Sequence, residues 1–444
     1  MSALSAVIVG GGLAGLAAGY ALSQAGWTVH LLEAGDEVGG RVRTVRKQGY
    51  TLDTGATQMS SGYTEYLGLC KQLGMGDDMV ESSSEIGLIN GEKLFSIDGR
   101  SMLSSLFTPA LSWGSKWTIV KTVCDAMAIK PGVDIYDVSR SHAVDVESAE
   151  AYTLRRLNRE IFDVLVDPLV RAYVMNAADH VSALEWFSAM KNLGGKTMLS
   201  LKGGNDRLPK ALAQHMQVTT GAAVLGVAKS GGTVAVRCRM PDGVEQTLHA
   251  DACVLATRLN EAMEIYPVAR DIAGDFGAEL RYNRAWVVQL GYTRQPEKNL
   301  VGVLVSRAAE HRIGLLWCEH AKNPDRVPVG HGLFSVYSDE SANDECLAMS
   351  DEGLTAVATC FVERLFPELR GAFDMSHVTR WAQAIPNPAP GMYKSMAAMK
   401  MRLDASDPVQ LAGDYFTCTG QNSAIFYGQA AARTLLAQRL PDAA

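Results

Sequence analysis

AVIVGGGLAG, residues 6–15, is the stretch that decides the fold of this chain. Its four leading apolar residues predict a short buried strand, and the glycines that follow fit the pattern G-x-G-x-x-G at the turn into a helix. Apolar residues continue at helical spacing toward Gly26, and a second apolar run, Thr28–Leu32, ends at Glu33. This order of strand, glycine turn, helix and strand with an acidic end is typical of units that bind the pyrophosphate of a dinucleotide. The sequence therefore predicts an α/β fold with a Rossmann-like unit at its start.

Each glycine and the acidic residue of this unit has a physical role in binding a dinucleotide. Gly10 allows the tight turn, Gly12 lets the backbone approach a phosphate, and Gly15 lets the helix pack close to the strand. Glu33 can accept the ribose hydroxyls and would repel a 2′-phosphate, which argues against NADP. The residues predicted to bind the cofactor here are Gly10, Gly12, Leu13, Ala14, Gly15, Glu33 and Ala34. The unit alone is compatible with NAD and with FAD.

Three further segments favour FAD. Gly39-Gly40-Arg41 places a guanidinium, which can donate to a pyrophosphate, just after the acidic position. The second segment is GYTLDTGA, 49–56, and the third is LAGD, 411–414, followed by QNSA, 421–424, at the start of a helix. A helix that begins near Asn422 would direct its positive end at the flavin, where reduction places negative charge.

Together these segments resemble the superfamily of flavin amine oxidases, protoporphyrinogen oxidases and phytoene desaturases, and the resemblance covers nearly the full chain. In that superfamily the G-G-R motif touches the FAD phosphate and ribose. The D-x-G-A segment runs beside the flavin ring, and the C-terminal G-D segment and the next helix hold the ribityl chain and the pyrimidine end. The cofactor-binding residues that the resemblance adds are Gly39, Gly40, Arg41, Gly55, Ala56, Thr57, Val224, Gly413, Asp414, Asn422, Ser423 and Ala424.

The resemblance also implies two domains, a discontinuous Rossmann-like FAD-binding domain and an α+β substrate domain. We assign 1–80, 200–265 and 378–444 to the FAD-binding domain, and 81–199 and 266–377 to the substrate domain. Alternating apolar residues from 224 to 238, with glycine turns between them and after them, predict a three-stranded meander in the central piece.

Several departures from the amine oxidases of this superfamily bear on the substrate. Those enzymes usually carry a lysine near the flavin, but LRYNRAWVV, 280–288, contains none. Gly420 stands where one of two aromatic residues beside the flavin is usual. PGMY, 390–393, replaces the G-G-C that would link the flavin covalently, so the resemblance implies non-covalent FAD.

RWAQAIP, 380–386, resembles the R-W-x-x-A-x-P of protoporphyrinogen oxidases and desaturases. We therefore expect an enzyme that removes hydride from a C–H of an apolar or carbonyl-bearing small molecule, with Tyr393 and Trp381 facing the flavin. One alternative is an amine oxidase with an atypical pocket, acting on CH–NH2. Another is a flavoprotein without redox turnover, either an isomerase or an FAD-binding module.

The composition of the chain excludes some classes of binding partner. The net charge of −7, without a basic stripe, argues against nucleic acid. The eight cysteines form no C-x-x-C pair, which is typical of reduced thiols in a cytoplasmic protein, and the nine histidines show no metal-ligand spacing. We expect a small-molecule substrate and an electron acceptor, either oxygen or a quinone. The sequence indicates no oligomeric state.

One helical stretch is open to two interpretations. Trp117, Val120, Cys124 and Met127 share a helix face, which predicts a core helix. The alternative is a mouth for an apolar substrate that touches a membrane surface. Lysines interrupt this stretch too often for it to span a membrane.

Overall fold

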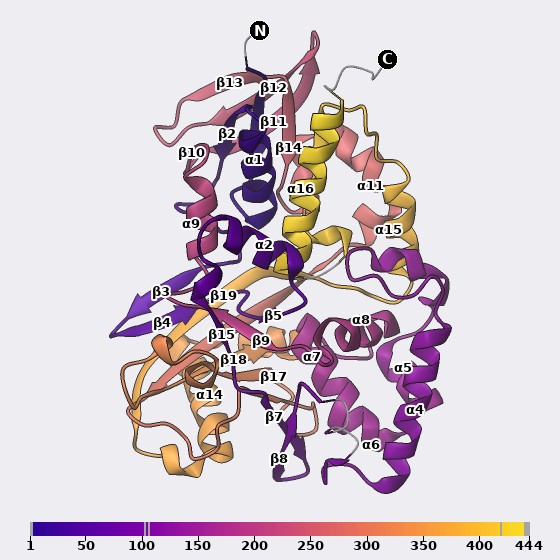
Figure 1. The fold of residues 1–444 in the computed structure, drawn as a ribbon, viewed down its shortest axis with the longest axis vertical. Coiled ribbons are helices and arrows are strands. Elements are labelled where there is room, and N and C mark those ends of the chain that lie inside the picture. Colours follow the sequence, from indigo (N-terminus) through magenta and orange to yellow (C-terminus); the bar gives the residue numbers. More distant parts are fainter. Residues whose placement is uncertain (1–2, 102–103, 105–106, 418–419, 439–444) are drawn as a thin grey trace.

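The structure is a computed structural model that describes residues 3–101, 104, 107–417 and 420–438. The molecule is elongated, and both termini lie at the same end (Figure 1). A parallel sheet with its helices occupies that end, and a larger sheet with a second group of helices occupies the other (Figure 1).

A five-stranded parallel sheet forms the framework of the first half. In spatial order its strands are β10 (Gln217–Thr219), β2 (Thr28–Leu32), β1 (Ser5–Val9), β14 (Ala252–Leu255) and β20 (Val409–Leu411). Successive side chains of a strand point to opposite faces, so β1 contributes to two hydrophobic clusters.

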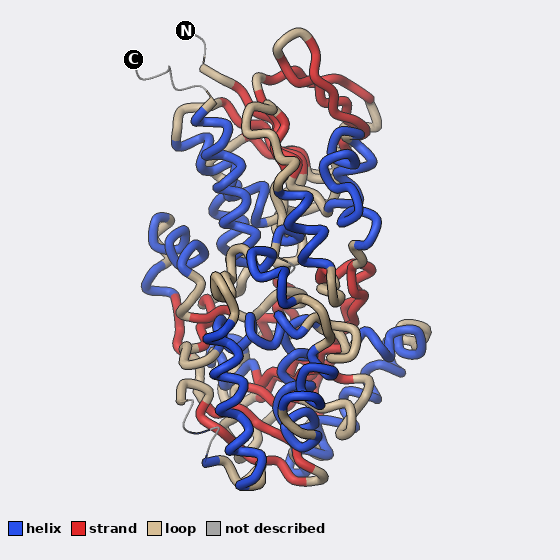
Figure 2. Tube along the Cα trace, turned by 90° about the vertical axis from the view of Figure 1, so that its right-hand side faces the viewer, coloured by secondary structure: helices blue, strands red, loops and turns tan. Residues whose placement is uncertain are grey.

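These two clusters make the parallel sheet the middle layer of three. Ala6 and Ile8 pack in the cluster that contains α1 (Leu13–Gln24) and α16 (Gln421–Ala437). Val7 and Val9 pack in the cluster that contains the antiparallel meander. The meander consists of β11 (Ala223–Ser230), β12 (Thr233–Arg239) and β13 (Glu245–Ala250). Helices and strands of this half appear as separate layers in Figure 2.

The second half is built on a mixed seven-stranded sheet. Its order is β19 (Phe373–Pro386), β15 (Tyr282–Tyr292), β18 (Gly332–Ser338), β17 (Ile313–Cys318), β16 (Gly302–Leu304), β7 (Glu85–Asn90) and β8 (Lys93–Asp98). Helix α14 (Asp351–Leu365) covers one face. The segment around α7 (Asp167–Val174) packs on the other face, and α8 (Ala183–Leu193) packs against α7. Helices α4 (Trp113–Ala128) and α5 (Ala149–Arg156) lie at the outer edge (Figure 1).

The predicted elements at the start of the chain are confirmed, since β1 ends at Val9 and β2 has the predicted bounds. The meander is confirmed as well. All five strands of the parallel sheet come from the three segments assigned to the FAD-binding domain, whereas β19 crosses our boundary at residue 378. The prediction that the face of Trp117 lies in the core is wrong, because 76% of that side chain is exposed. No helix among the described residues is long and apolar enough to cross a membrane.

Two glycines of similar helical setting allow a test of the packing between α1 and α16. A Cβ on Gly428 of α16 would lie 2.1 Å from the carbonyl oxygen of Ala14, whereas a Cβ on Gly68 of α2 (Thr64–Gln72) would meet nothing within 4 Å. We expect Gly428→Ala to lower the free energy of unfolding by roughly 1–3 kcal/mol through overpacking. Gly68→Ala should raise it by roughly 0.5–1 kcal/mol. Urea denaturation of both variants checks this, and a shift of the same sign in both would contradict it.

Candidate functional site

A cavity of about 640 Å³ lies at the carboxyl ends of the parallel strands and continues to the seven-stranded sheet. Gly10 follows β1, Glu33 follows β2, Ala256 follows β14 and Gly413 comes just after β20, and all four line the cavity. This edge is where open parallel sheets bind ligands, since the loops there diverge and leave a crevice. Side chains of β15, β17 and β19 line the opposite end, so the cavity lies between the two halves.

The glycine turn leaves the N-terminus of α1 open to the cavity. Gly12 is the N-cap residue, no side chain caps this helix, and a Cβ on Gly12 would meet nothing within 4 Å. A Cβ on Gly15, by contrast, would lie 2.0 Å from the carbonyl oxygen of Gly10, so Gly15 serves the close packing of helix on strand. The uncapped N–H groups and the positive end of the helix dipole make this turn suited to a phosphate.

Glu33 is held by the backbone of the same turn. Its Oε2 accepts a hydrogen bond of 2.6 Å from the N–H of Gly11, and its Oε1 accepts one of 2.7 Å from the N–H of Gly35. Each carboxylate oxygen keeps a further lone pair. Glu33 is therefore fixed at the cavity wall with acceptor capacity left for hydroxyl groups.

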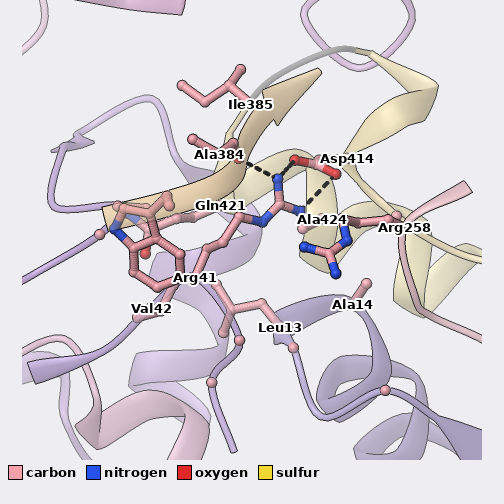
Figure 3. A pocket seen from close by; sticks show the side chains of 18 of the residues that line it. Leu13, Ala14, Arg41, Val42, Arg258, Ala384, Ile385, Asp414, Gln421 and Ala424 are labelled. Carbon is pink, nitrogen blue, oxygen red and sulfur yellow. Dashed lines mark hydrogen bonds and ion pairs between the residues drawn. The ribbon is translucent and has the colours of Figure 1, made fainter. Parts of the chain in front are cut away.

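Arg41 and Asp414 join the first and last parts of the chain across the cavity (Figure 3). Nη1 of Arg41 lies 2.8 Å from Oδ2 of Asp414, Nη2 donates to Oδ1 at 3.0 Å, and Nη1 also donates to the carbonyl of Ala384 at 2.7 Å. Burial alone would lower the pKa of Arg41, but Asp414 raises it above its ordinary value, so the guanidinium stays charged. These contacts use three of its five N–H groups and leave two for a ligand.

Arg258 is a cavity residue that sequence reasoning missed. It follows β14, caps α10 (Leu259–Ile265) and pairs with Glu261 one turn later, its Nε lying 3.0 Å from Oε1. Its side chain lies near that of Arg41 in Figure 3. Arg258 could have been predicted from its position shortly after a buried strand of the parallel sheet, because the other predicted cofactor-binding residues also follow such strands.

At the start of α16 only one of the three predicted residues, Ala424, lines the cavity, and Gln421 lines it beside Ala424. These two residues lie three positions apart on one helix face. Asn422 points away, because its Oδ1 accepts hydrogen bonds from the N–H groups of Glu65 at 2.9 Å and Tyr66 at 3.1 Å. Asn422 therefore holds the start of α2, and the predicted cofactor contact of its side chain and of Ser423 does not appear in the cavity wall.

The end of the cavity at the seven-stranded sheet is mainly apolar. Its wall there consists of Ala172, Met175, Ala285, Val287, Leu315, Trp317, Trp381 and Ile385. Three tyrosines, Tyr63, Tyr173 and Tyr337, supply its polar edges. Burial raises the pKa of Tyr63 to about 12 and also raises the pKa of the other two, so these edges stay uncharged. One end of the cavity thus suits phosphates and ribose, and the other suits an apolar ring.

Comparison with known proteins gives this arrangement a family. The model of the flavin containing amine oxidoreductase family matches residues 13–436. The chain belongs to this family. It is 24% identical to protoporphyrinogen oxidase 2 of Arabidopsis thaliana, over 85% of this chain and 83% of that protein. It is 22% identical to coproporphyrinogen III oxidase of Bacillus subtilis, over 96% of both chains.

The same fold occurs in cyclohexylamine oxidase of Brevibacterium oxydans, with a TM-score of 0.79 at 18% identity over 98% of this chain and 99% of that one. The predicted resemblance, the two-domain FAD-binding architecture and the FAD cofactor are thereby confirmed. The protein is an FAD-dependent oxidoreductase of this family.

The residues present fit FAD. The uncapped start of α1 and the two remaining N–H groups of Arg41 suit the pyrophosphate, and Glu33 suits the adenosine ribose. At the other end, Oε1 of Gln421 is buried without a hydrogen-bond partner in the described part of the chain, and it stands at the start of α16. When bound there, FAD supplies the capacity to accept hydride. The apolar end of the cavity offers a position next to the cofactor from which apolar side chains exclude water.

Most of the predicted site residues come together in this one cavity. Those that line it are Gly10, Gly12, Leu13, Ala14, Glu33, Ala34, Gly39, Gly40, Arg41, Gly55, Ala56, Thr57, Val224, Trp381, Gly413, Asp414 and Ala424. Those that do not line it are Gly15, Tyr393, Asn422 and Ser423.

Tyr393 requires a correction. Its side chain is fully buried, and its hydroxyl donates to Glu185 of α8 while its N–H donates to Asp145 at 2.9 Å. It is the second residue of α15 (Met392–Lys400) and packs with Met392 and Met396 in a hydrophobic cluster. Because the chain turns into this helix right after Gly391, the tyrosine points into the core and not toward the cavity.

Two buried ion pairs lie behind the cavity wall. Nη1 of Arg326 is 2.5 Å from Oδ2 of Asp53, and Nζ of Lys322 is 3.1 Å from Oε2 of Glu319. Burial alone would raise the pKa of Glu319, but Lys322 and Arg326 bring it below its ordinary value, so the pair stays ionised. Lys322 also donates to Oγ1 of Thr57 at 3.0 Å, and Thr57 lines the cavity. A lysine therefore supports the wall from behind through its hydrogen bond to a lining residue.

We expect Arg41→Ala to retain FAD roughly tenfold less tightly, because the variant loses the guanidinium and leaves Asp414 without its partner in the cavity. The measurement is the ratio of flavin to protein absorbance after dialysis. Arg140→Ala is the control, since Arg140 is 56% exposed and lies 3.5 Å from Asp134 outside the cavity wall. An Arg41→Ala protein that stays as yellow as the control would overturn the assignment of Arg41.

Lys322→Met should lower the free energy of unfolding by about 3–5 kcal/mol, because it leaves the buried Glu319 carboxylate without its nearest counterion. The matched control is Arg239→Met, which removes an exposed partner of Glu245 at 2.9 Å and should cost at most about 1 kcal/mol. Urea denaturation of both variants measures the difference. Similar small losses in the two would mean that the buried pair is not a stabilising contact.

Glu185 predicts a dependence of stability on pH. Burial first, and Asp145 second, raise the pKa of Glu185 from 4.5 to about 8. Between these two pH values the unfolded chain releases this proton while the folded chain keeps it, so the wild type loses stability as pH rises. Glu185→Gln is neutral in both states and still accepts from Tyr393.

The variant should therefore gain stability relative to the wild type by up to about 1.4 kcal/mol per pH unit across this window. Urea denaturation at several pH values measures it, and Glu92→Gln, at an exposed turn, is the control. A difference between Glu185→Gln and the wild type that stays flat with pH would contradict the burial of an uncharged Glu185.

Proposed function

We propose that this FAD-dependent oxidoreductase removes hydride from a C–H of an apolar or carbonyl-bearing ring substrate. The hydride passes to FAD, the neighbouring carbon loses a proton to solvent, and a new carbon–carbon double bond remains. One observation carries the proposal: the substrate end of the cavity is walled by apolar side chains, with no lysine or histidine among the described lining residues. Val287 lies on the strand where amine oxidases of the superfamily usually carry a lysine. An amine substrate would need a basic group there to take its proton, and the tyrosines at this end are not basic.

The relatives support the same choice. Protoporphyrinogen and coproporphyrinogen III oxidases match this chain over most of its length, whereas polyamine oxidase 4 of Oryza sativa matches over 57% of it. The substrates in the first two names are large rings with apolar faces. The proposal therefore extends to a cyclic tetrapyrrole as the first substrate class to test.

Trp381 is the residue that we propose faces the flavin. Its Nε1 donates to the carbonyl of Thr54 at 2.9 Å, and a Cβ on Gly55 would lie 3.2 Å from its Cζ2. The indole is thus fixed against the segment that the resemblance places beside the flavin ring. Trp381→Ala should slow flavin reduction by roughly tenfold or more while FAD stays bound, because the substrate loses a rigid wall.

We propose further that FAD is bound without a covalent link, that oxygen or a quinone reoxidises it, and that the protein works in the cytoplasm. No described cysteine lines the cavity, and the seven described cysteines are free thiols, as expected in a reducing compartment. Acid precipitation should release all flavin into the supernatant. Flavin that stays with the precipitate would contradict the first point.

Anaerobic flavin reduction with a substrate panel tests the function. Coproporphyrinogen III and protoporphyrinogen are expected to bleach the flavin and to yield products with additional double bonds. Putrescine and cyclohexylamine are the comparison arm, and bleaching by these amines, with an aldehyde or ketone and ammonia as products, would replace the proposal with amine oxidation. A protein that holds FAD and is bleached by neither arm, under conditions where dithionite reduces it, would favour a flavoprotein without redox turnover.

A further inference from the structure

Helix α4 is built with its apolar side outward. The described residues include fifteen large apolar side chains that are exposed, and six of them fall between 107 and 127. They are Phe107, Trp113, Trp117, Val120, Val123 and Met127. Single exposed apolar residues are ordinary on protein surfaces, but a concentration of this kind, five of the six on one helix, marks a contact surface.

The inward face of α4 explains why the apolar face points out. Ser115 and Thr122 are at most 2% exposed, and Ser115 accepts a hydrogen bond from Asn158 at 2.9 Å. Asp125 also ties the helix to α5, where it accepts hydrogen bonds from Tyr152 at 2.8 Å and Arg156 at 2.7 Å. Small and polar side chains thus attach α4 to the rest of the protein, and its large apolar side chains are exposed to solvent.

The exposed apolar groups lie on one side of the helix, where the buried Lys116 is covered by the ring of Trp113 at 4.5 Å. At about 100° per residue, Trp113, Trp117, Val120, Val123 and Met127 fall within an arc of roughly 120°. Two of the five are tryptophans, whose ring and N–H suit the boundary between water and lipid. Figure 1 places α4 at the edge of the molecule, with no element outside it in that view.

Local charge favours an anionic partner. Residues 107–130 contain Lys116, Lys121, Lys130 and Asp125, a net charge of +2 in a chain whose net charge is −7. Asp125 is paired with Arg156. Lys121 and Lys130 are exposed, and no carboxylate within the described part of the chain pairs with either. The face therefore combines apolar groups with free cations in an otherwise acidic protein.

The size of the face argues against a second copy of the chain. Sixteen residues make a helix about 24 Å long, and a face about 10 Å wide would offer roughly 240 Å². A stable protein interface needs about 800 Å² from each partner. An amphipathic helix that lies in a lipid interface has no such threshold, since it inserts its apolar face a few ångströms deep and adds electrostatic attraction.

We propose that α4 docks the protein onto an anionic lipid bilayer, with Trp113, Trp117 and Met127 inserted and Lys121 at the headgroups. This inference does not depend on the proposed reaction. It replaces the prediction of a core helix and develops the alternative from the sequence, which was contact of this stretch with a membrane surface.

Vesicle flotation of the FAD-loaded, full-length protein tests the proposal. The probes are vesicles of phosphatidylcholine alone and of equimolar phosphatidylcholine and phosphatidylglycerol. The wild type should float with the anionic vesicles and several-fold less with the neutral ones, and added salt should weaken binding. Trp113→Ser with Trp117→Ser should reduce binding by roughly tenfold or more, and Lys121→Glu should reduce it mainly on anionic vesicles.

Val329→Ser with Met401→Ser is the matched control, since these side chains are 101% and 88% exposed elsewhere on the surface. It should float like the wild type, and the flavin spectrum reports that each variant is folded. A wild type that stays with the lipid-free fraction at low salt would overturn the proposal, as would a double tryptophan variant that floats unchanged. A wild-type dimer in sedimentation that the tryptophan variant converts to monomers would assign the face to a second copy instead.

Discussion

The pairing of Arg41 with Asp414 is the interaction on which the site depends. It bridges 373 positions of sequence and fixes the loop after the second strand against the loop after the last strand of the parallel sheet. A guanidinium placed in a cavity between two halves of a protein needs a fixed counterion, since burial without one is costly. Asp414 provides it, while the carbonyl of Ala384 on β19 ties the same guanidinium to the second sheet. Three segments far apart in the chain are thus held at one point of the cavity wall.

The polar end of the cavity could be predicted from the sequence because its signals are local. A glycine turn, its helix and an acidic strand end follow each other within 6–33, and backbone sterics decide what each glycine does. Arg258 shows where this reasoning stops. It reaches the cavity only because β14 lies beside β1 in the sheet, and that neighbourhood is a product of the fold.

The misplaced residues have a common physical cause, which is side-chain direction. Along α16 the residues at 421 and 424 share the cavity face and those at 422 and 423 do not, so Ala424 lines the cavity as predicted whereas Asn422 and Ser423 do not. Tyr393 failed for a similar reason, since its helix turns it into the core against Glu185. On α4 the periodicity was read correctly, but a period alone does not state which face is buried. The buried side is set by Ser115 and Thr122, which find partners or a close fit on neighbouring elements.

The buried charges behind the wall show how the two halves cooperate. Asp53 ends β4 (Tyr50–Asp53), just before the cavity-lining residues 55–58. Glu319 and Lys322 belong to α12 (Glu319–Lys322), the short helix after β17, and Arg326 follows it. Two acids and two bases cancel in net charge, so the group adds little field at long range, yet each member is costly to leave alone. Because a shift of Thr57 relative to β17 would separate these buried charges, the position of Thr57 is firmly held. The apolar end of the cavity therefore keeps its shape through charges that lie behind its wall, while the side chains of the wall itself are uncharged.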